Sequence, residues 1–270
     1  MMSNQHLPEE LLDLIVDLLH KERRTLRKCC LVSKLWILRA RKHLFADIKL
    51  YSAKALQSWK TAFLDPSTSP ACYVRILITI CFPEIVTTGA EEDGCISTFT
   101  NVLDFGMVAP ETDPGESPIS LLPFYRFSPG LKTLHLAFPI VPPPQLFNLI
   151  CSFPLLDDLH VVSFGGWSGS DKVSVDKAIS IRSLVSPPFT GFLELDLKAG
   201  LDLVASRLLS LPGGLHFRRL RLMLNQEKDV VPVMALVEGC RSTLESLEIE
   251  HELSGLFICH LSAPITYLCS

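Results

Sequence analysis

Residues 131–136 read LKTLHL, and this order of apolar and polar residues recurs four more times towards the C-terminus. The later copies are LDDLHV at 156–161, FLELDL at 192–197, FRRLRL at 217–222 and LESLEI at 244–249. The five copies start 25, 36, 25 and 27 residues apart. Alternating apolar and polar residues predict short strands that bury one face, and a unit that recurs at such intervals predicts a repeat array.

Helices are predicted between the copies, at 144–152, 201–210 and 229–239. Two earlier strands are expected at 45–50 and 73–80, separated by a helix at 53–64. This alternation of strand and helix predicts an α/β fold. An ordinary α/β domain without repeats is the alternative, because leucine periodicity alone does not distinguish the two.

Two less regular segments are predicted as loops. The segment GGWSGSDK at 165–172 falls within the longest interval, and a solenoid can accommodate such an insertion. The segment APETDPGESP at 109–118 is acidic and contains prolines, which predicts a flexible loop.

The first fifty residues have a different pattern. Residues 8–19 place Leu11, Leu12, Ile15, Leu18 and Leu19 on one helical face, with acidic residues largely opposite. Pro8 suits the first position of this amphipathic helix. A second helical stretch is predicted from about 25 to 42, apolar on more than one side. A unit this small cannot hide all of that apolar surface, so it is expected to dock on another protein.

The same residues resemble an F-box of the fungal type over about 6–46. The resemblance lies in LPEELLDLIVDLL at 7–19, TLRKCCLVSKLW at 25–36 and RARKHLF at 39–45, in that order. It implies a three-helix unit that binds a Skp-type adaptor and, through it, a cullin scaffold. The residues that it assigns to the adaptor contact are Leu7, Pro8, Leu11, Leu12, Ile15, Leu31, Val32 and Trp36. The alternative is that several of them, with Leu18 and Leu26, only form the internal core of the three helices.

The later phrases resemble leucine-rich repeats of the kind found after F-boxes, over most of 131–250. The asparagine that commonly closes the strand turn is present once, as Asn225. Together the resemblances imply an α/β fold with a small three-helix F-box at 1–50, a helix and linker at 51–70, and an irregular leucine-rich-repeat solenoid at 71–270. The end of the chain is apolar and lacks a polar capping repeat, so the array is expected to be truncated and 253–270 to pack poorly.

Polar residues of the strand phrases are expected to point outward from the sheet. The outward positions are Thr133, His135, Asp158, His160, Glu194, Asp196, Lys198, Arg219, Arg221, Ser246, Glu248 and Glu250. Their charge changes sign from repeat to repeat, which suits a protein or peptide better than a nucleic-acid backbone. The candidate substrate-binding residues among them are His135, His160, Asp196, Arg219, Arg221 and Glu248.

The motifs of common enzyme sites are absent from the sequence: no GxxxxGK[ST], GxGxxG, HExxH or GxSxG occurs. No catalytic residue and no cofactor is therefore predicted. The nine cysteines form no CxxC pair, and they are interpreted as reduced, buried thiols of a cytosolic or nuclear protein. A metal site at His251, Cys259, His260 and Cys269 is the weaker alternative, because its spacing matches no zinc template.

Nothing in the charge or the hydropathy requires a nucleic acid or a membrane as partner, and neither is predicted. The net charge is −4, and the ten Lys and Arg residues within 21–49 fit a solvated helical face, with only Trp36 available for base stacking. The apolar run ILITICF at 76–82 is too short to cross a bilayer, and the N-terminus lacks a secretory signal. The expected function is thus a non-catalytic substrate receptor of an SCF-type ubiquitin ligase. The alternatives are a protein-binding repeat scaffold without a ligase role and, more distantly, an enzyme.

Overall fold

A computed structural model describes residues 8–65, 68–80, 96, 98–108, 124, 127–137, 143–163, 187–198, 200–251 and 259–261. Leu7, both predicted loops and nearly all of 253–270 lie outside these residues, so the expectations for them stay predictions.

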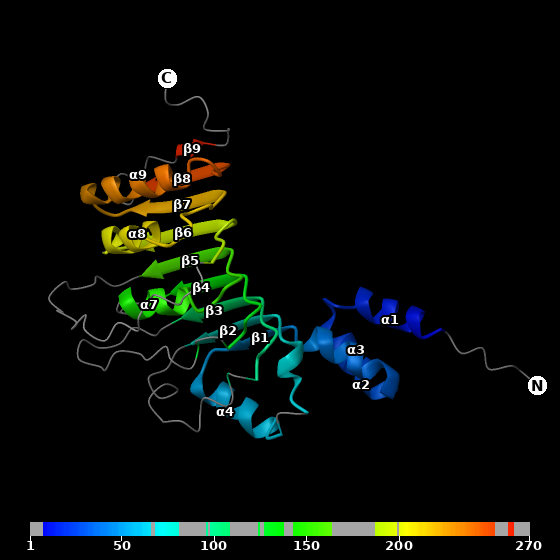
Figure 1. The fold of residues 1–270 in the computed structure, drawn as a ribbon. Coiled ribbons are helices and arrows are strands. Elements are labelled where there is room, and N and C mark those ends of the chain that lie inside the picture. The colour runs from blue at the N-terminus through cyan, green and yellow to red at the C-terminus, as the bar shows by residue number, and fades with distance from the viewer. Residues whose placement is uncertain are drawn as a thin grey trace, which may run out of the picture.

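The described residues form one sheet of nine strands whose spatial order is their order along the chain (Figure 1). The first eight strands pair in parallel, and the short last strand pairs antiparallel. Their bounds are β1 Asp47–Leu50, β2 Ile76–Ile80, β3 Asp104–Val108, β4 Thr133–Ala137, β5 Asp158–Ser163, β6 Phe192–Leu197, β7 Arg219–Leu224, β8 Ser246–His251 and β9 Cys259–Leu261.

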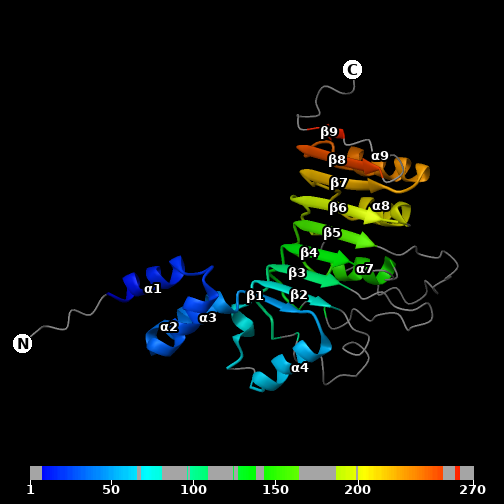
Figure 2. The ribbon, with the colours of Figure 1, turned by 180° about the vertical axis from the view of Figure 1, so that it is seen from behind.

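Helices α7 (Pro143–Ile150), α8 (Leu201–Leu209) and α9 (Val230–Gly239) cover the same side of this sheet, as Figures 1 and 2 show. Helix α4 (Ala53–Ala62) follows β1, and short 3₁₀ turns lie at Pro70–Tyr73 and Glu227–Asp229. The predicted α/β class is confirmed, and the helices predicted at 53–64, 144–152, 201–210 and 229–239 are present within two residues at each end.

The main core lies between the sheet and these helices. Parallel pairing aligns one leucine of each later strand in a row, and all of them are buried: Leu134, Leu159, Leu193, Leu220 and Leu247. The residues on either side of each leucine are partly exposed, as the alternating pattern predicts. Because each strand adds a leucine to the same row, the core continues from repeat to repeat.

The register of β6 differs from the prediction. The match between the copies LDDLHV and FLELDL predicts that Leu195 pairs with Leu159, but the sheet pairs Leu159 with Leu193. Phe192 consequently lies on the outer face, and the fully buried Phe189 replaces it as the leading apolar residue. Phe189 has φ 45°, a conformation in which the chain fits one extra residue before the strand. The corrected intervals between aligned leucines are 25, 34, 27 and 27 residues, from 134 to 159, 193, 220 and 247.

Three helices precede the sheet: α1 (Glu9–Leu18), α2 (Arg23–Val32) and α3 (Lys34–Leu44). The helical stretch predicted from about 25 to 42 is present, but it is divided in two because Ser33 separates α2 from α3. Ser33 is extended, with φ −149° and ψ 138°, and its Oγ accepts a hydrogen bond from Leu35 N at 3.3 Å. Serine is a favoured N-cap residue, so it ends one helix and starts the next.

These helices have a small core of their own. Val16, Leu26, Cys29 and Ala40 are buried together and form a cluster separate from the core of the sheet. The link to the sheet includes polar contacts: Arg23 Nη2 donates to the carbonyls of Leu44 and Asp47, each at 3.0 Å. Among the described residues, no helix is long and apolar enough to cross a membrane.

The cysteines follow the prediction only in part. Cys29, Cys151 and Cys240 are buried, and burial raises the pKa of the Cys151 and Cys240 thiols to about 11. Cys72, by contrast, is exposed on the turn before β2, so the expectation of buried thiols is wrong there.

Candidate functional site

Helices α1–α3 carry a surface of large exposed apolar side chains, called here the helical apolar surface. Within the described residues its members are Leu11, Leu14, Ile15, Leu18, Leu31, Val32, Leu35 and Leu38. The most exposed are Leu31 at 87%, Leu18 at 74% and Val32 at 73%. Single exposed leucines are common on soluble proteins, but eight within three short helices indicate a surface that a partner covers.

The predicted adaptor residues divide between this surface and the interior of the three helices. Pro8, Leu11, Ile15, Leu31 and Val32 are exposed, as a contact residue must be. Leu12 is half-buried. Trp36 packs against the small core of the three helices, so Trp36 has a structural role at least in part. Leu26 belongs entirely to that core.

Four members of the helical apolar surface were not among the predicted contact residues: Leu14, Leu18, Leu35 and Leu38. The sequence predicts Leu18 on the apolar face of the first helix, with a place in the internal core of the three helices as the alternative. Leu35 and Leu38 could have been found only by knowing that a new helix starts at Ser33, because that break sets which side of α3 faces solvent.

A polar cluster holds α1 against α3. Asp17 of α1 accepts hydrogen bonds from Arg39 Nε at 2.6 Å and from His43 Nε2 at 2.7 Å, and it also pairs with Arg39 Nη2. The bonds from Arg39 and then from His43 hold the pKa of the Asp17 carboxyl well below its usual range. Because these contacts fix α1, they also fix the apolar residues that α1 presents.

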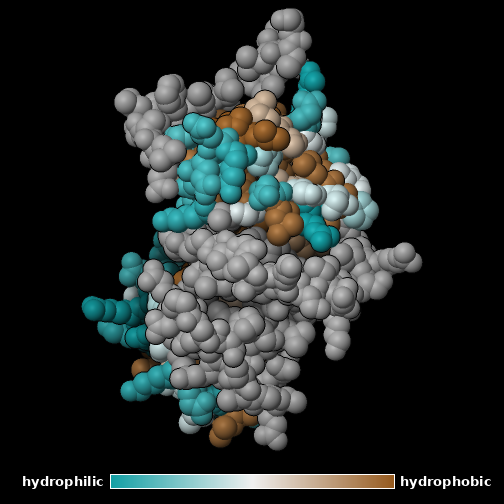
Figure 3. All heavy atoms as spheres, turned by 90° about the vertical axis from the view of Figure 1, so that its left-hand side faces the viewer, coloured by the Kyte–Doolittle hydropathy of each residue, from teal (hydrophilic) through white to brown (hydrophobic). Residues whose placement is uncertain are grey.

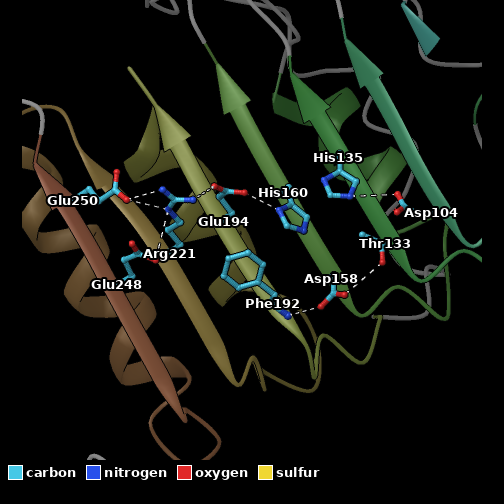
Figure 4. Close-up of polar contacts among 10 residues, drawn as sticks. All are labelled: Asp104, Thr133, His135, Asp158, His160, Phe192, Glu194, Arg221, Glu248 and Glu250. Carbon is cyan, nitrogen blue, oxygen red and sulfur yellow. Dashed lines mark hydrogen bonds and ion pairs between the residues drawn. The ribbon is translucent and has the colours of Figure 1, made fainter. Parts of the chain in front are cut away.

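The second candidate surface lies on the outer face of the sheet, the face that points away from α7–α9. Parallel register places five residues of successive strands directly beside one another: His135, His160, Glu194, Arg221 and Glu248. Asp104 adjoins one end of this row and Glu250 adjoins the other (Figure 4). These seven residues are called the outer-face ladder.

Contacts run along the ladder from strand to strand. Asp104 Oδ1 is 3.3 Å from His135 Nε2, and the rings of His135 and His160 stack with centroids 4.1 Å apart. His160 Nδ1 is 2.7 Å from Glu194 Oε2, whose other oxygen is 3.3 Å from Arg221 Nη1. The ladder therefore joins six neighbouring strands, β3 to β8, through side chains alone.

Arg221 is the centre of the C-terminal half of the ladder. Its guanidinium pairs with three carboxylates: Glu250 at 2.7 Å, Glu194 at 3.3 Å and Glu248 at 3.7 Å. The hydrogen bond to Glu250 and the surrounding carboxylates raise the pKa of Arg221. A shallow hollow adjoins this cluster and is lined by Glu194, Asp196, Arg221, Met223 and Glu250, with Leu195 and Leu222.

The six predicted substrate residues do not share one row. His135, His160, Arg221 and Glu248 belong to the outer-face ladder. Asp196 lines the hollow beside it, and Arg219 stands over the ring of Phe192, with its Cζ 5.2 Å from the ring centroid.

Glu194 is central to the ladder but is not among the six predicted substrate residues, and neither are Glu250 and Asp104. The predicted register explains the omission of Glu194: aligning Leu195 with Leu159 makes Asp196 the neighbour of His160, whereas the sheet gives that place to Glu194. The buried leucine row is the signal that would have corrected it.

Other features of the described residues are less concentrated. On the helix side, exposed apolar residues occur on α8 and α9 at Leu203, Val230, Val231 and Met234. Figure 3 shows hydrophobic areas there interrupted by hydrophilic ones. No group of three or more His, Cys, Asp or Glu side chains in the described part of the chain is arranged to hold a metal ion.

Comparison with known proteins adds no relative: no protein-family model, no curated protein and no solved structure matches the chain. The two surfaces are therefore interpreted from their own chemistry. One is an apolar helical surface suited to a partner with a complementary groove, and the other is a charged and aromatic sheet face suited to a polar polypeptide.

Proposed function

We propose that the chain is the substrate-receptor subunit of an SCF-type ubiquitin ligase in the cytoplasm or nucleus. In this proposal, α1–α3 are an F-box that binds a Skp-type adaptor, and the sheet with its helices is an irregular leucine-rich-repeat solenoid that holds a target protein. The observation that carries the proposal is the helical apolar surface, which contains four of the residues that the F-box resemblance assigns to the adaptor.

Burial energetics support docking at this surface. Complete burial of one leucine or valine side chain is worth about 1.5–3 kcal/mol, so Leu18, Leu31 and Val32 together offer roughly 5–9 kcal/mol before the costs of association. Only four side chains form the fully buried part of the helices' own core. The three helices thus leave more large apolar side chains for a partner than they bury among themselves.

The arrangement of the sheet supports the solenoid part of the proposal. Eight parallel strands follow in chain order, and aligned leucines recur at intervals of 25, 34, 27 and 27 residues from 134 onwards. Most of these intervals are within the length of a leucine-rich repeat, about 20–29 residues. The outer face, with its ladder of charged and aromatic side chains, is the surface that we assign to the target.

The proposed mechanism is positioning, with no bond made or broken by this chain. The adaptor would attach the receptor to the ligase, and the solenoid would hold a lysine of the target near the charged conjugating enzyme. Holding both reactants in one complex raises their effective concentration, and this replaces a bimolecular encounter with an intramolecular one.

Binding to a purified Skp-type adaptor tests the adaptor-binding part. Leu31→Gln combined with Leu35→Gln keeps helix-compatible residues but removes two exposed apolar contacts, and we expect at least a tenfold loss of affinity, about 1.4 kcal/mol. The control is Met234→Gln, which changes an exposed apolar residue on α9, 57% exposed against 62% for Leu35, and should leave the affinity unchanged.

Failure of the folded wild-type chain to bind any Skp-type adaptor would remove the ligase role. A repeat scaffold that binds proteins through its outer face would then be the better interpretation.

A further inference from the structure

The two histidines of the outer-face ladder form a stacked pair between two acids. Strand pairing sets His135 of β4 directly beside His160 of β5, and the ring planes differ by 24°. Asp104 of β3 contacts His135 from one side, and Glu194 of β6 contacts His160 from the other (Figure 4). The order across four strands is therefore acid, imidazole, imidazole, acid.

The two rings have unequal surroundings. The side chain of His160 is 16% exposed, and the edge of the Phe192 ring packs against it with centroids 5.0 Å apart. The side chain of His135 is 44% exposed and lies nearer to solvent. His135 therefore has the greater freedom to turn away if the stack becomes unfavourable.

The charges that face the pair come from every neighbouring strand. Asp104 of β3 faces His135, while Asp158 of β5 and Glu194 of β6 act on His160. Burial lowers the pKa of His160, and a charge on His135 lowers it further, whereas the hydrogen bond to Glu194 opposes both effects. Arg221 of β7 lies beyond Glu194 and shares its carboxylate.

We propose that the stacked His135–His160 pair is a proton-operated switch in the outer-face ladder. The pair accepts one proton while stacked, but a second proton puts like charges on two rings whose centroids are 4.1 Å apart and drives the rings apart. His135 then turns towards Asp104 and solvent, and the face of His160 is uncovered. The proposed target would meet a closed surface at neutral pH and an opened, more positive one in mild acid.

This inference rests on the proposed function only in naming the target as the partner that senses the change. The switch itself is a property of the free chain. A proton on His160 also strengthens the ion pair between His160 and Glu194. His160 then competes with Arg221 for the carboxylate of Glu194. Acidification would thereby weaken the contact between Arg221 and Glu194 and so affect the C-terminal half of the ladder.

Imidazole NMR of the isotope-labelled full chain between about pH 5 and 8 tests the switch. We expect His135→Gln to raise the titration midpoint of His160 by about 0.7 pH unit, which corresponds to the repulsion of two charges about 4 Å apart in water. Glu194→Gln should lower that midpoint, because the ion pair that favours the charged ring is lost. His216, which lies outside the ladder, is the internal control, and its resonances should be the same in all variants.

The wild-type chain gives a readout that needs no variant. The titration curve of His160 should be broader than that of an independent ring, and the His135 resonances should shift in the same pH range as the stack opens. A curve of independent shape for each ring, with the His160 midpoint unchanged by His135→Gln, would overturn the proposal. Because no adaptor or target is present, that outcome would leave the ligase proposal untouched, and loss of adaptor binding would leave the switch untouched.

Discussion

Gly191 determines how the chain enters β6. A Cβ at this position would overlap Asp158 Oδ1, the same oxygen that accepts a hydrogen bond from Phe192 N at 2.6 Å. The carboxylate thus occupies the space of a missing side chain and aligns the start of β6 with β5.

Gly191→Ala should therefore destabilise the chain by about 1–3 kcal/mol, because Asp158 must move and give up its bond to Phe192 N. Denaturant unfolding measures the loss. Gly130→Ala is the matched control, since the nearest atom to its added Cβ is 3.9 Å away, and it should change the free energy of unfolding little.

The register of β6 predicts unequal losses of stability when either of two phenylalanines three residues apart is replaced. Phe189 is fully buried and contacts Phe217 with ring centroids 5.0 Å apart, so Phe189→Ala should cost about 3–5 kcal/mol. Phe192 lies on the outer face, so Phe192→Ala should cost only about 1 kcal/mol through its contacts with His160 and Arg219. Equal losses, or a greater loss at Phe192, would restore the register expected from the phrase FLELDL.

At the scale of elements, hydrophobic periodicity was enough to locate most strands and helices but not their alignment. Leucine or isoleucine at alternate positions identifies β4, β7 and β8, because only one assignment turns these residues towards the core. In β6, both Phe192 and Leu193 are apolar, so the sequence pattern fits two registers, and tertiary pairing with Leu159 selects one. The neighbours of His160 could not be named until that choice was made.

Helix breaks were harder to predict than helices. The stretch from 25 to 42 has apolar residues on more than one side, and only the N-cap role of Ser33 divides it. Serine is compatible with a helix interior as well as a cap, so its role depends on how α3 packs against α1 and α2. The helical apolar surface was accordingly predicted in part, through Leu11, Ile15, Leu31 and Val32.

Asp17 makes the packing of α1 on α3 depend on pH. Because its folded-state pKa is lowered, its contribution is present above the ordinary value of 3.8 and is lost as the pH falls through the lowered value. At neutral pH, Asp17→Asn should lower the free energy of local opening of α1 by about 1 kcal/mol. The effect is this small because the cluster is partly exposed to solvent. Amide hydrogen exchange within α1 measures this. Asp13→Asn is the control, as Asp13 is 3.7 Å from Arg39, and its effect should be smaller.

At the scale of the whole molecule, each of the two hydrophobic cores supports a different surface. The small core of α1–α3 supports a surface that presents apolar side chains, and the continuous core of the sheet supports a polar outer face. A receptor of the proposed kind needs both, because one surface must attach to the ligase while the other remains open to a target.

The central claim is that the helical apolar surface, and not the outer face, binds the Skp-type adaptor. Amide hydrogen exchange of the full chain with and without a saturating purified adaptor tests it most directly. We expect protection to increase within α1–α3, including residues 31–38, and to stay unchanged in β4–β8. No change in α1–α3, or protection confined to the strands, would contradict it.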